Sequence, residues 1–338
     1  MGDVRIALVG CGAMGEIVAG ACYAQPNDNY QLVAVVDARP ERAEPLARSL
    51  GVPGFAALAD LFASEVAVDA VDLRLPHHLH APVAVEAVEH GVHVLVEKPL
   101  ATTLADGKRI VDAGRAAGVV VAVAENYPHL PSVRAVAEAL ARQEIGTVHA
   151  LRTTRAYTLD GVWTRDGWRQ DGGPSAGVLL DQGTHHTSLL RRLGGEIVSV
   201  SAQAHTAGEA ETVLLTVRFA SGLLGQSLYS WGSLALDGEP EATVFGSTGR
   251  IDIRVSYHGD RGGAIRYDAS EPVGAPISGP ENYYDSHRLI IDDWAAAVAE
   301  HRAPRVPAQD ALADLAVVLA AARSVAEGGV PIPVPALD

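Results

Sequence analysis

Hydrophobic residues follow two kinds of pattern along the first 125 residues. Short, nearly continuous apolar runs alternate with longer segments in which apolar residues recur every three or four positions. Such runs are typical of strands covered on both faces, and such segments are typical of helices. Strands are expected at residues 4–9, 31–37, 70–75, 93–97 and 119–124, and helices at 15–24, 40–50, 80–90 and 104–117. Repeated strand–helix units with short links predict an α/β fold with a doubly wound parallel sheet.

The pattern changes after residue 125. Apolar and polar positions now alternate in runs separated by glycines and acidic residues, which predicts a mostly antiparallel sheet. Strands are expected at residues 147–157, 198–205, 212–219, 224–231, 242–245 and 251–255, and helices at 132–142, 177–193, 284–301 and 308–327. We therefore expect two domains, residues 1–125 and residues 126–338. The second is an α+β domain with an open sheet, and the last helix is a candidate to pack back on the first domain.

Charge and cysteine content narrow the class of protein. The formal net charge is −15 and no basic stretch stands out, which argues against nucleic acid or an anionic membrane surface as a partner. No apolar stretch is long enough to span a bilayer, and no signal-peptide pattern precedes the first strand. The two cysteines, Cys11 and Cys22, fall in one turn–helix unit and are not expected to bridge. A reducing, cytoplasmic location is therefore expected.

A glycine-rich loop joins the first strand to the first helix. Its sequence is Gly10-Cys11-Gly12-Ala13-Met14-Gly15, which has the G-x-G-x-x-G spacing of dinucleotide-binding loops. Asp37 ends the second strand, where an acid can accept hydrogen bonds from the adenosine ribose and repel a 2′-phosphate. NAD is therefore favoured over NADP, although Arg39 and Arg42 follow closely and could soften that preference. The alternative is a glycine turn in another kind of α/β protein.

Lysine is rare in this chain. Of 26 basic residues only Lys98 and Lys108 are lysines. Lys98 follows the apolar run at 93–97, which predicts a position at the carboxyl end of a buried strand. A lysine in a buried site can release its proton, whereas an arginine cannot. Lys98 is thus a candidate for proton chemistry, and the alternative is a surface lysine kept by chance.

Three further blocks, in this order along the chain, point to one family. They are Leu75-Pro76-His77-His78-Leu79-His80, then Glu97-Lys98-Pro99, then Asp181-Gln182-Gly183-Thr184-His185. Together with the glycine loop they resemble the glucose–fructose oxidoreductase / inositol dehydrogenase (Gfo/Idh/MocA) family over essentially the whole chain. Two positions depart from the usual family pattern. His77 stands where members often have Asn or Asp, and Ser188 stands where many carry an acid.

The resemblance implies a Rossmann domain, a second domain built on an open sheet, and an active site between them. It also implies oxidation or reduction of sugars, cyclitols or related polyols with NAD or NADP. By match of motif, Lys98 would lie beside the nicotinamide, with Asp181 and His185 as acid–base partners. The family habit further implies a homodimer or homotetramer formed through the second sheet.

The roles of the three residues can be assigned as hypotheses. Asp181 and His185 are four residues apart on a predicted helix, so both project from one face. We assign proton exchange with the substrate hydroxyl to His185, charge stabilisation at the same oxygen to Lys98, and orientation of the substrate to Asp181. Lys98 remains a rival for proton transfer. The alternatives are a histidine satisfied at a domain surface and an acid that only caps its helix.

Other residues are candidates for contacts. His80 is expected to begin the helix after the third strand, near the nicotinamide. The candidate cofactor contacts are Gly10, Gly12, Ala13, Met14, Gly15, Asp37, Arg39, Leu75, Pro76, His77, His80, Glu97, Lys98 and Asn126. The candidate substrate contacts are Lys98, Trp163, Trp168, Arg169, Asp181, His185 and Tyr284. The two tryptophans offer flat faces for a sugar ring, but they could equally anchor their own loop. No metal is expected, because no acid or cysteine completes a ligand set with the clustered histidines.

Two other functions stay open at this point. One is a redox-neutral enzyme that uses tightly bound NAD to drive elimination or hydrolysis of a glycoside. The other is a nucleotide-sensing protein without catalysis, although a sensor would have no need of Lys98.

Overall fold

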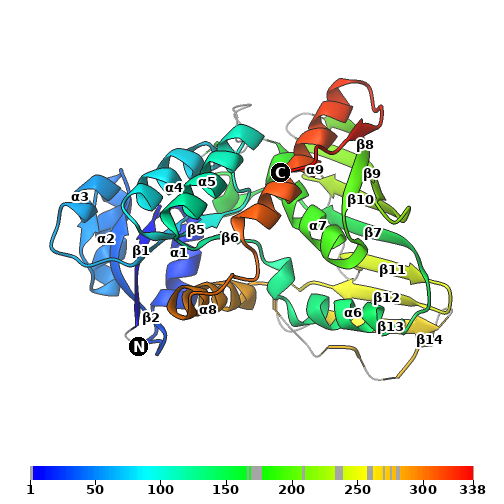
Figure 1. Ribbon diagram of the computed structural model, residues 1–338, viewed down its shortest axis with the longest axis horizontal. Helices are drawn as coiled ribbons and strands as arrows, with labels where there is room; N and C mark the ends of the chain where they lie inside the picture. Colours follow the sequence, from blue (N-terminus) through cyan, green and yellow to red (C-terminus); the bar gives the residue numbers. More distant parts are fainter. Residues whose placement is uncertain are drawn as a thin grey trace. The chain divides into compact units, whose positions relative to one another are not determined.

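The computed structural model describes residues 3–165, 167–168, 177–207, 210–232, 239–256, 262–268, 271–274, 276–278 and 282–337. The chain forms two compact units (Figure 1). The first comprises Met1–Glu125 and His287–Leu312, and the second comprises Asn126–Ser286 and Ala313–Asp338.

The first unit contains a parallel sheet. Its strands are β1 (Val4–Val9), β2 (Tyr30–Val36), β3 (Gly54–Phe55), β4 (Ala70–Leu73), β5 (His93–Glu97) and β6 (Val121–Ala124). Their order across the sheet is β3-β2-β1-β4-β5-β6, with β1 paired in parallel to both β2 and β4. The chain order reverses between β1 and β4, and this is the place where doubly wound sheets bind ligands at the carboxyl ends of their strands. The predicted doubly wound parallel sheet is confirmed.

Helices cover this sheet and one of them comes from far along the chain. The helices of the N-terminal segment are α1 (Ala13–Val18), α2 (Pro40–Leu50), α3 (Leu58–Phe62), α4 (His80–Glu89) and α5 (Leu104–Ala117), and α1 continues as the π-helical turn η1 (Ala19–Tyr23). Helix α8 (Asp285–Glu300) lies beside β2 in Figure 1. Its residues Ile290 and Trp294 join Ile6, Leu8 and Leu95 in one buried core. The first unit is therefore completed by a segment that follows most of the second.

The second unit contains a mixed, mostly antiparallel sheet. Its strands are β7 (Val148–Ala156), β8 (Ile197–Ala207), β9 (Ala210–Phe219), β10 (Leu224–Ser230), β11 (Ala242–Gly246), β12 (Arg250–Arg254), β13 (Gly263–Asp268), β14 (Glu271–Pro272) and β15 (Ile332–Pro333). Among the described residues their order is β14-β13-β12-β11-β7-β10-β9-β8-β15. The neighbours β7 and β10 run parallel, and the other strand pairs among the described residues of this sheet run antiparallel. The mostly antiparallel character of the sheet is thus as predicted.

One face of this sheet is covered by helices α6 (Pro131–Ala141), α7 (Val178–Gly194) and α9 (Ala308–Ala326). Side chains alternate along β9, so that Val213, Leu215 and Val217 are buried while Leu214 is exposed. Buried residues of α6, α7 and α9 share one hydrophobic core with these strands. The open sheet therefore keeps one face against its helices.

Several short elements were not expected from the sequence. Strands β3, β14 and β15 have two residues each, too few for an alternating pattern to be recognised. The parallel pairing of β7 with β10 was also missed, because pairing between strands distant in sequence depends on the topology of the whole sheet. None of the helices in the described parts of the chain has the length and hydropathy of a membrane span.

Candidate functional site

The glycine loop after β1 cannot accommodate side chains at two of its positions. Gly10 has a φ of +97°, and a Cβ there would lie 2.3 Å from the carbonyl oxygen of Arg74. A Cβ on Gly15 would lie 2.0 Å from the carbonyl oxygen of Gly10. The turn between β1 and α1 therefore requires glycine, which leaves its backbone open to the close approach of a pyrophosphate.

Asp37, just beyond β2, holds the same loop. Its carboxylate accepts hydrogen bonds from the backbone N–H of Cys11 at 2.8 Å and of Arg39 at 2.9 Å. Asp37 is half-buried and Arg39 is exposed. A carboxylate anchored beside the glycine loop fits the ribose-binding acid of an NAD site. Gly12, Ala13 and Met14 complete the turn, with Gly12 at the N-cap of α1. These residues fit a dinucleotide.

The connection from β4 to α4 lies at the carboxyl edge of the sheet. His77 is buried in a 3-10 turn (His77–Leu79), with its ring 5.7 Å from that of His80. His80 is the first residue of α4, and its side chain is fully buried. Its Nδ1 lies 2.7 Å from the carbonyl oxygen of Pro99, and its Nε2 lies 2.9 Å from that of Leu75. Burial lowers the pKa of His80 to about 4, so the ring is neutral at pH 7.

Lys98 directly follows β5 at the same edge. It is only 9% exposed, and the peptide bond from Lys98 to Pro99 is cis. The preceding residue, Glu97, is also buried and forms an ion pair with Arg74. Lys98 therefore lies where a doubly wound fold presents residues to a bound cofactor.

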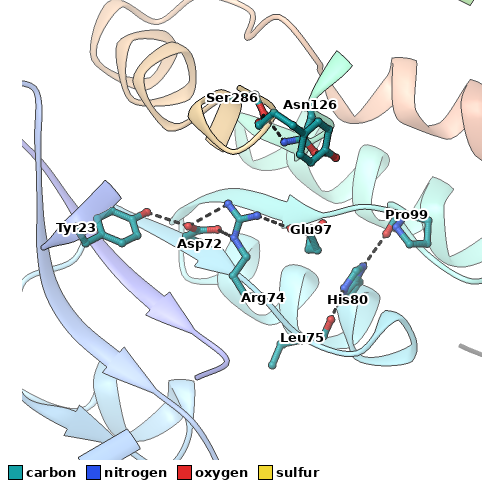
Figure 2. A network of polar contacts seen from close by, with 10 residues as sticks. Tyr23, Asp72, Arg74, Leu75, His80, Glu97, Pro99, Asn126 and Ser286 are labelled. Carbon is teal, nitrogen blue, oxygen red and sulfur yellow. Dashed lines mark hydrogen bonds and ion pairs between the residues drawn. The ribbon is translucent and has the colours of Figure 1, made fainter. Parts of the chain in front are cut away.

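A buried polar network connects to Glu97, and the sequence analysis did not anticipate it. The Nε of Arg74 lies 2.7 Å from Asp72 Oδ1, and the Tyr23 hydroxyl donates to Asp72 Oδ2 at 2.9 Å. Figure 2 shows Arg74 between the two carboxylates, with Tyr23 at the far end of the network. A sequence signal did exist, because Asp72 and Arg74 are two charged residues in an otherwise apolar run.

Helix α7 carries the Asp181 and His185 pair. Both are buried, at 2% and 6% exposure, and they are separated by about one helical turn. The Gln182 side chain donates to Asp181 Oδ2 at 2.8 Å. An added Cβ on Gly183 would lie 3.2 Å from Val318, so this glycine lets α9 pack closely on α7.

Aromatic residues surround His185. Its ring centroid lies 5.7 Å from that of Tyr127 and 6.4 Å from that of Tyr283, both edge-to-face. The hydroxyl of Tyr283 donates to Asn126 Oδ1 at 2.8 Å. Asn126 Nδ2 donates to Ser286 at 2.6 Å, and Figure 2 shows this second bond. The predicted cofactor contact Asn126 is therefore buried within a hydrogen-bond network of the second unit.

Another buried carboxylate, Glu241, was also missed by the sequence analysis. It accepts hydrogen bonds from the Tyr127 hydroxyl and from His186 Nε2, the latter at 2.9 Å. Burial raises the pKa of Glu241, but the charge of Arg155 and the bonds from His186 and Tyr127 outweigh it, so the pKa lies below its usual value. An ionised Glu241 thus holds the tyrosine that packs against His185.

The structure describes three of the remaining predicted substrate contacts, Trp163, Trp168 and Tyr284. Trp163 ends a 3-10 turn (Gly161–Trp163), and Trp168 is half-buried. Tyr284 packs edge-to-face on Tyr283 at 5.9 Å. Arg169 lies outside the described residues. Among the residues that the structure describes, no group of histidine, cysteine or acidic side chains could hold a metal ion.

Comparison with protein families places both parts of the chain. Residues 4–125 match a family described as "Oxidoreductase family, NAD-binding Rossmann fold". Residues 133–252 match one described as "GFO/IDH/MocA C-terminal domain".

Individual relatives are similar over different lengths. Levoglucosan dehydrogenase of Pseudarthrobacter phenanthrenivorans is 31% identical over 61% of this chain and 55% of its own length. The 1,5-anhydro-D-fructose reductase of Ensifer adhaerens is 28% identical over 96% of this chain and 97% of its own. The structure of the WlbA dehydrogenase from Bordetella pertussis, in complex with NADH and UDP-GlcNAcA, is 28% identical and superposes with a TM-score of 0.81. It covers 99% of this chain and 100% of that one.

Proposed function

Because the chain belongs to the Gfo/Idh/MocA oxidoreductase family, with its NAD-binding Rossmann fold, we propose that it oxidises a secondary alcohol, or reduces the matching ketone, of a sugar, inositol or related polyol. The first unit binds NAD and the second binds the substrate. The observation that carries the proposal is the buried Lys98 at the carboxyl edge of the parallel sheet. The named relatives support it, because they include dehydrogenases and reductases of sugars and inositols.

The chain's own residues manage the proton and the orientation of the substrate. When bound, the nicotinamide supplies the hydride chemistry. In the proposal, His185 takes the proton of the substrate hydroxyl, and Lys98 donates a hydrogen bond to the same oxygen and stabilises its negative charge. Asp181 orients the substrate from one turn away on α7. This requires Lys98 of the first unit to meet Asp181 and His185 of the second at the bound substrate.

Two lysines make the test of this proposal well controlled. We expect the Lys98→Met variant to lose kcat/KM by about 10²–10⁴-fold, because it loses both charge stabilisation and a proton-handling group. The reaction is followed as NADH formed from a panel of sugars, inositols and related polyols. Lys108→Met is the matched control, since Lys108 is the other lysine and is exposed on α5. It should retain activity within roughly twofold.

The outcomes separate the proposed function from its rivals. Full turnover by the Lys98→Met protein would remove the assigned role of Lys98. Product formed without net NADH would indicate a redox-neutral enzyme, which the names of the relatives do not favour. Binding of NAD without turnover of any polyol would indicate a nucleotide sensor.

We also propose that the chain forms a homodimer or homotetramer through the second sheet. Leu214, Leu224 and Phe245 are large apolar side chains that are 45%, 50% and 37% exposed. Leu224 of β10 pairs with Ala150 of β7, and Ala150 pairs in turn with Phe245 of β11. Leu224 and Phe245 therefore lie on the same face of the sheet. Leu214 lies opposite Leu228 on the same face. An apolar sheet face of this kind favours contact with a second copy of the chain.

A further inference from the structure

Lys98 lies between two residues that are each tied to the same neighbouring segment. Glu97, on its amino side, pairs with Arg74, and the carbonyl of Pro99, on its carboxyl side, faces His80. Both Arg74 and His80 belong to the segment that leads from β4 into α4. Figure 2 shows both connections, with Arg74 on Glu97 and His80 between Leu75 and Pro99. The residues on both sides of Lys98 are therefore held by the segment that follows β4, Glu97 through its side chain and Pro99 through its backbone carbonyl.

The Arg74 connection is almost wholly buried, so breaking it would leave a charge without its partner in the interior. The side chains of Arg74 and Asp72 have no exposed surface, and that of Glu97 is 10% exposed. Arg74 contacts Asp72 through Nε at 2.7 Å and through a terminal nitrogen at 3.3 Å. The ion pair at Nε and the hydrogen bond from Nη2 hold the guanidinium on Asp72, and its other terminal nitrogen, Nη1, donates to Glu97. A buried carboxylate paired in this way cannot leave its partner without losing its charge compensation.

The Arg74 backbone adds a second constraint on the same segment. Its carbonyl oxygen lies against Gly10, where any Cβ would clash. The residue that holds Glu97 is therefore itself packed against the dinucleotide loop. A shift of Arg74 would disturb both.

The His80 connection is made by a neutral ring. A neutral imidazole has a single N–H, which we assign to Nδ1 because its contact with the carbonyl oxygen of Pro99 is the shorter of the two. The ring lies between Pro99 and Leu75, at 2.7 and 2.9 Å from their carbonyl oxygens, with no exposed surface. Because the ring is uncharged at neutral pH, it fixes the backbone beyond Lys98 without placing a second cation near the ammonium group.

We propose that Arg74 and His80 are positioning residues that together hold Lys98 in place at the carboxyl edge of the sheet. Arg74 acts through the side chain of Glu97, and His80 acts through the backbone of Pro99. The inference goes beyond the proposed function in naming these two residues, and its catalytic consequence rests on the proposed role of Lys98.

The test uses the two lysines as separate signals. Full-length protein labelled with [ε-¹³C]lysine gives one NMR signal for Lys98 and one for Lys108, and Lys98→Met assigns them. We expect His80→Gln and Arg74→Lys to shift or broaden the Lys98 signal and to leave the Lys108 signal unchanged. Tyr23→Phe is the matched control, because it removes a hydrogen bond at the far end of the same buried network. It should leave both signals in place.

Kinetics provide the second readout. In His80→Gln and Arg74→Lys we expect kcat, measured at saturating NAD, to fall by about tenfold or more, because a displaced catalytic group slows the chemical step. A Lys98 signal that stays unchanged in both variants would overturn the inference, whatever the activity. If the Lys98 signal moves but Lys98→Met retains full turnover, the positioning inference stands and the proposed function fails.

Discussion

Asp37 links two properties of the cofactor site in a single carboxylate. Its two oxygens accept backbone N–H groups of the glycine loop and of Arg39. The same negative charge would repel a 2′-phosphate on the adenosine ribose. Asp37 therefore holds the loop, and we propose that it also sets the cofactor preference.

Substitution by asparagine removes the charge. Asp37→Asn keeps one oxygen acceptor, so one of the two backbone N–H groups retains its bond to this side chain. We expect the preference for NAD over NADP, measured as a ratio of kcat/KM values, to fall by about tenfold, which corresponds to about 1.4 kcal/mol. Asp60→Asn, on the exposed side of α3, makes the same change in net charge and should leave the ratio unaltered. An unchanged ratio in Asp37→Asn would show that its charge does not select the cofactor.

His80 makes the stability of the protein depend on pH. Its pKa is about 4 in the folded chain, below the usual value of 6.5, chiefly because burial disfavours the charged ring. As the pH falls, the unfolded chain therefore binds this proton first. The contribution to stability is complete above about pH 6.5 and is lost towards pH 4, by roughly 3 kcal/mol at most. Urea unfolding across this range should show a shallower pH dependence for His80→Gln than for the unmodified protein, and parallel curves would contradict the assignment.

Helix α7 is the element on which the second half of the candidate site depends. It presents Asp181 and His185 one turn apart, packs on α9 at Gly183, and ends against the sheet at Gly194. An added Cβ at Gly194 would lie 2.5 Å from the ring of Phe219 and 2.7 Å from Leu151. The end of the helix thus approaches β7 and β9 too closely for any side chain.

Two glycine-to-alanine changes test this close packing. Gly194→Ala should destabilise the protein by about 1–3 kcal/mol and lower its Tm, because the ring of Phe219 has no room for the methyl group. At Gly20, in η1, an added Cβ meets none of the described atoms within 4 Å. Gly20→Ala should therefore be neutral or stabilising by up to about 1 kcal/mol. Equal Tm values for the two variants would argue against the close approach of α7 to the sheet.

At the scale of the whole molecule, the second sheet has one face buried by helices and one face with exposed apolar residues. Leu214 lies on the open face, between the buried residues Val213 and Leu215. An arginine at this position would place a charge on the proposed contact between copies without entering the core.

Light scattering on purified protein tests this contact. Leu214→Arg should lower the molar mass towards that of one chain, while circular dichroism stays unchanged. Leu289→Arg, at a similarly exposed leucine of α8 in the first unit, is the control and should keep the original mass. A molar mass that is the same in both variants would place the contact elsewhere.

Local patterns in the sequence were sufficient to predict most of the elements and the family. Three elements have the predicted bounds: the strand Val4–Val9 and the helices Pro40–Leu50 and Leu104–Ala117. Hydrophobic periodicity and the residues that begin and end a helix are local properties of the sequence, so they could be recognised without the fold. The glycine loop, Lys98, and the pair Asp181 and His185 could be singled out in the same way. Their joint role in catalysis remains a prediction, since they belong to different units.

Other features depended on which strands lie side by side. The sequence by itself determined the doubly wound order of strands and helices, the dinucleotide loop and the candidate residue Lys98. Each of these can be recognised from residues that are adjacent in the sequence. Tertiary structure alone decided that Arg74 pairs with Glu97, that His80 reaches Pro99, and that Glu241 accepts from Tyr127 and His186. These partners are between 19 and 114 residues apart. A charged side chain in a buried strand finds its partner only when the sheet has formed, because only then does burial make an unpaired charge costly.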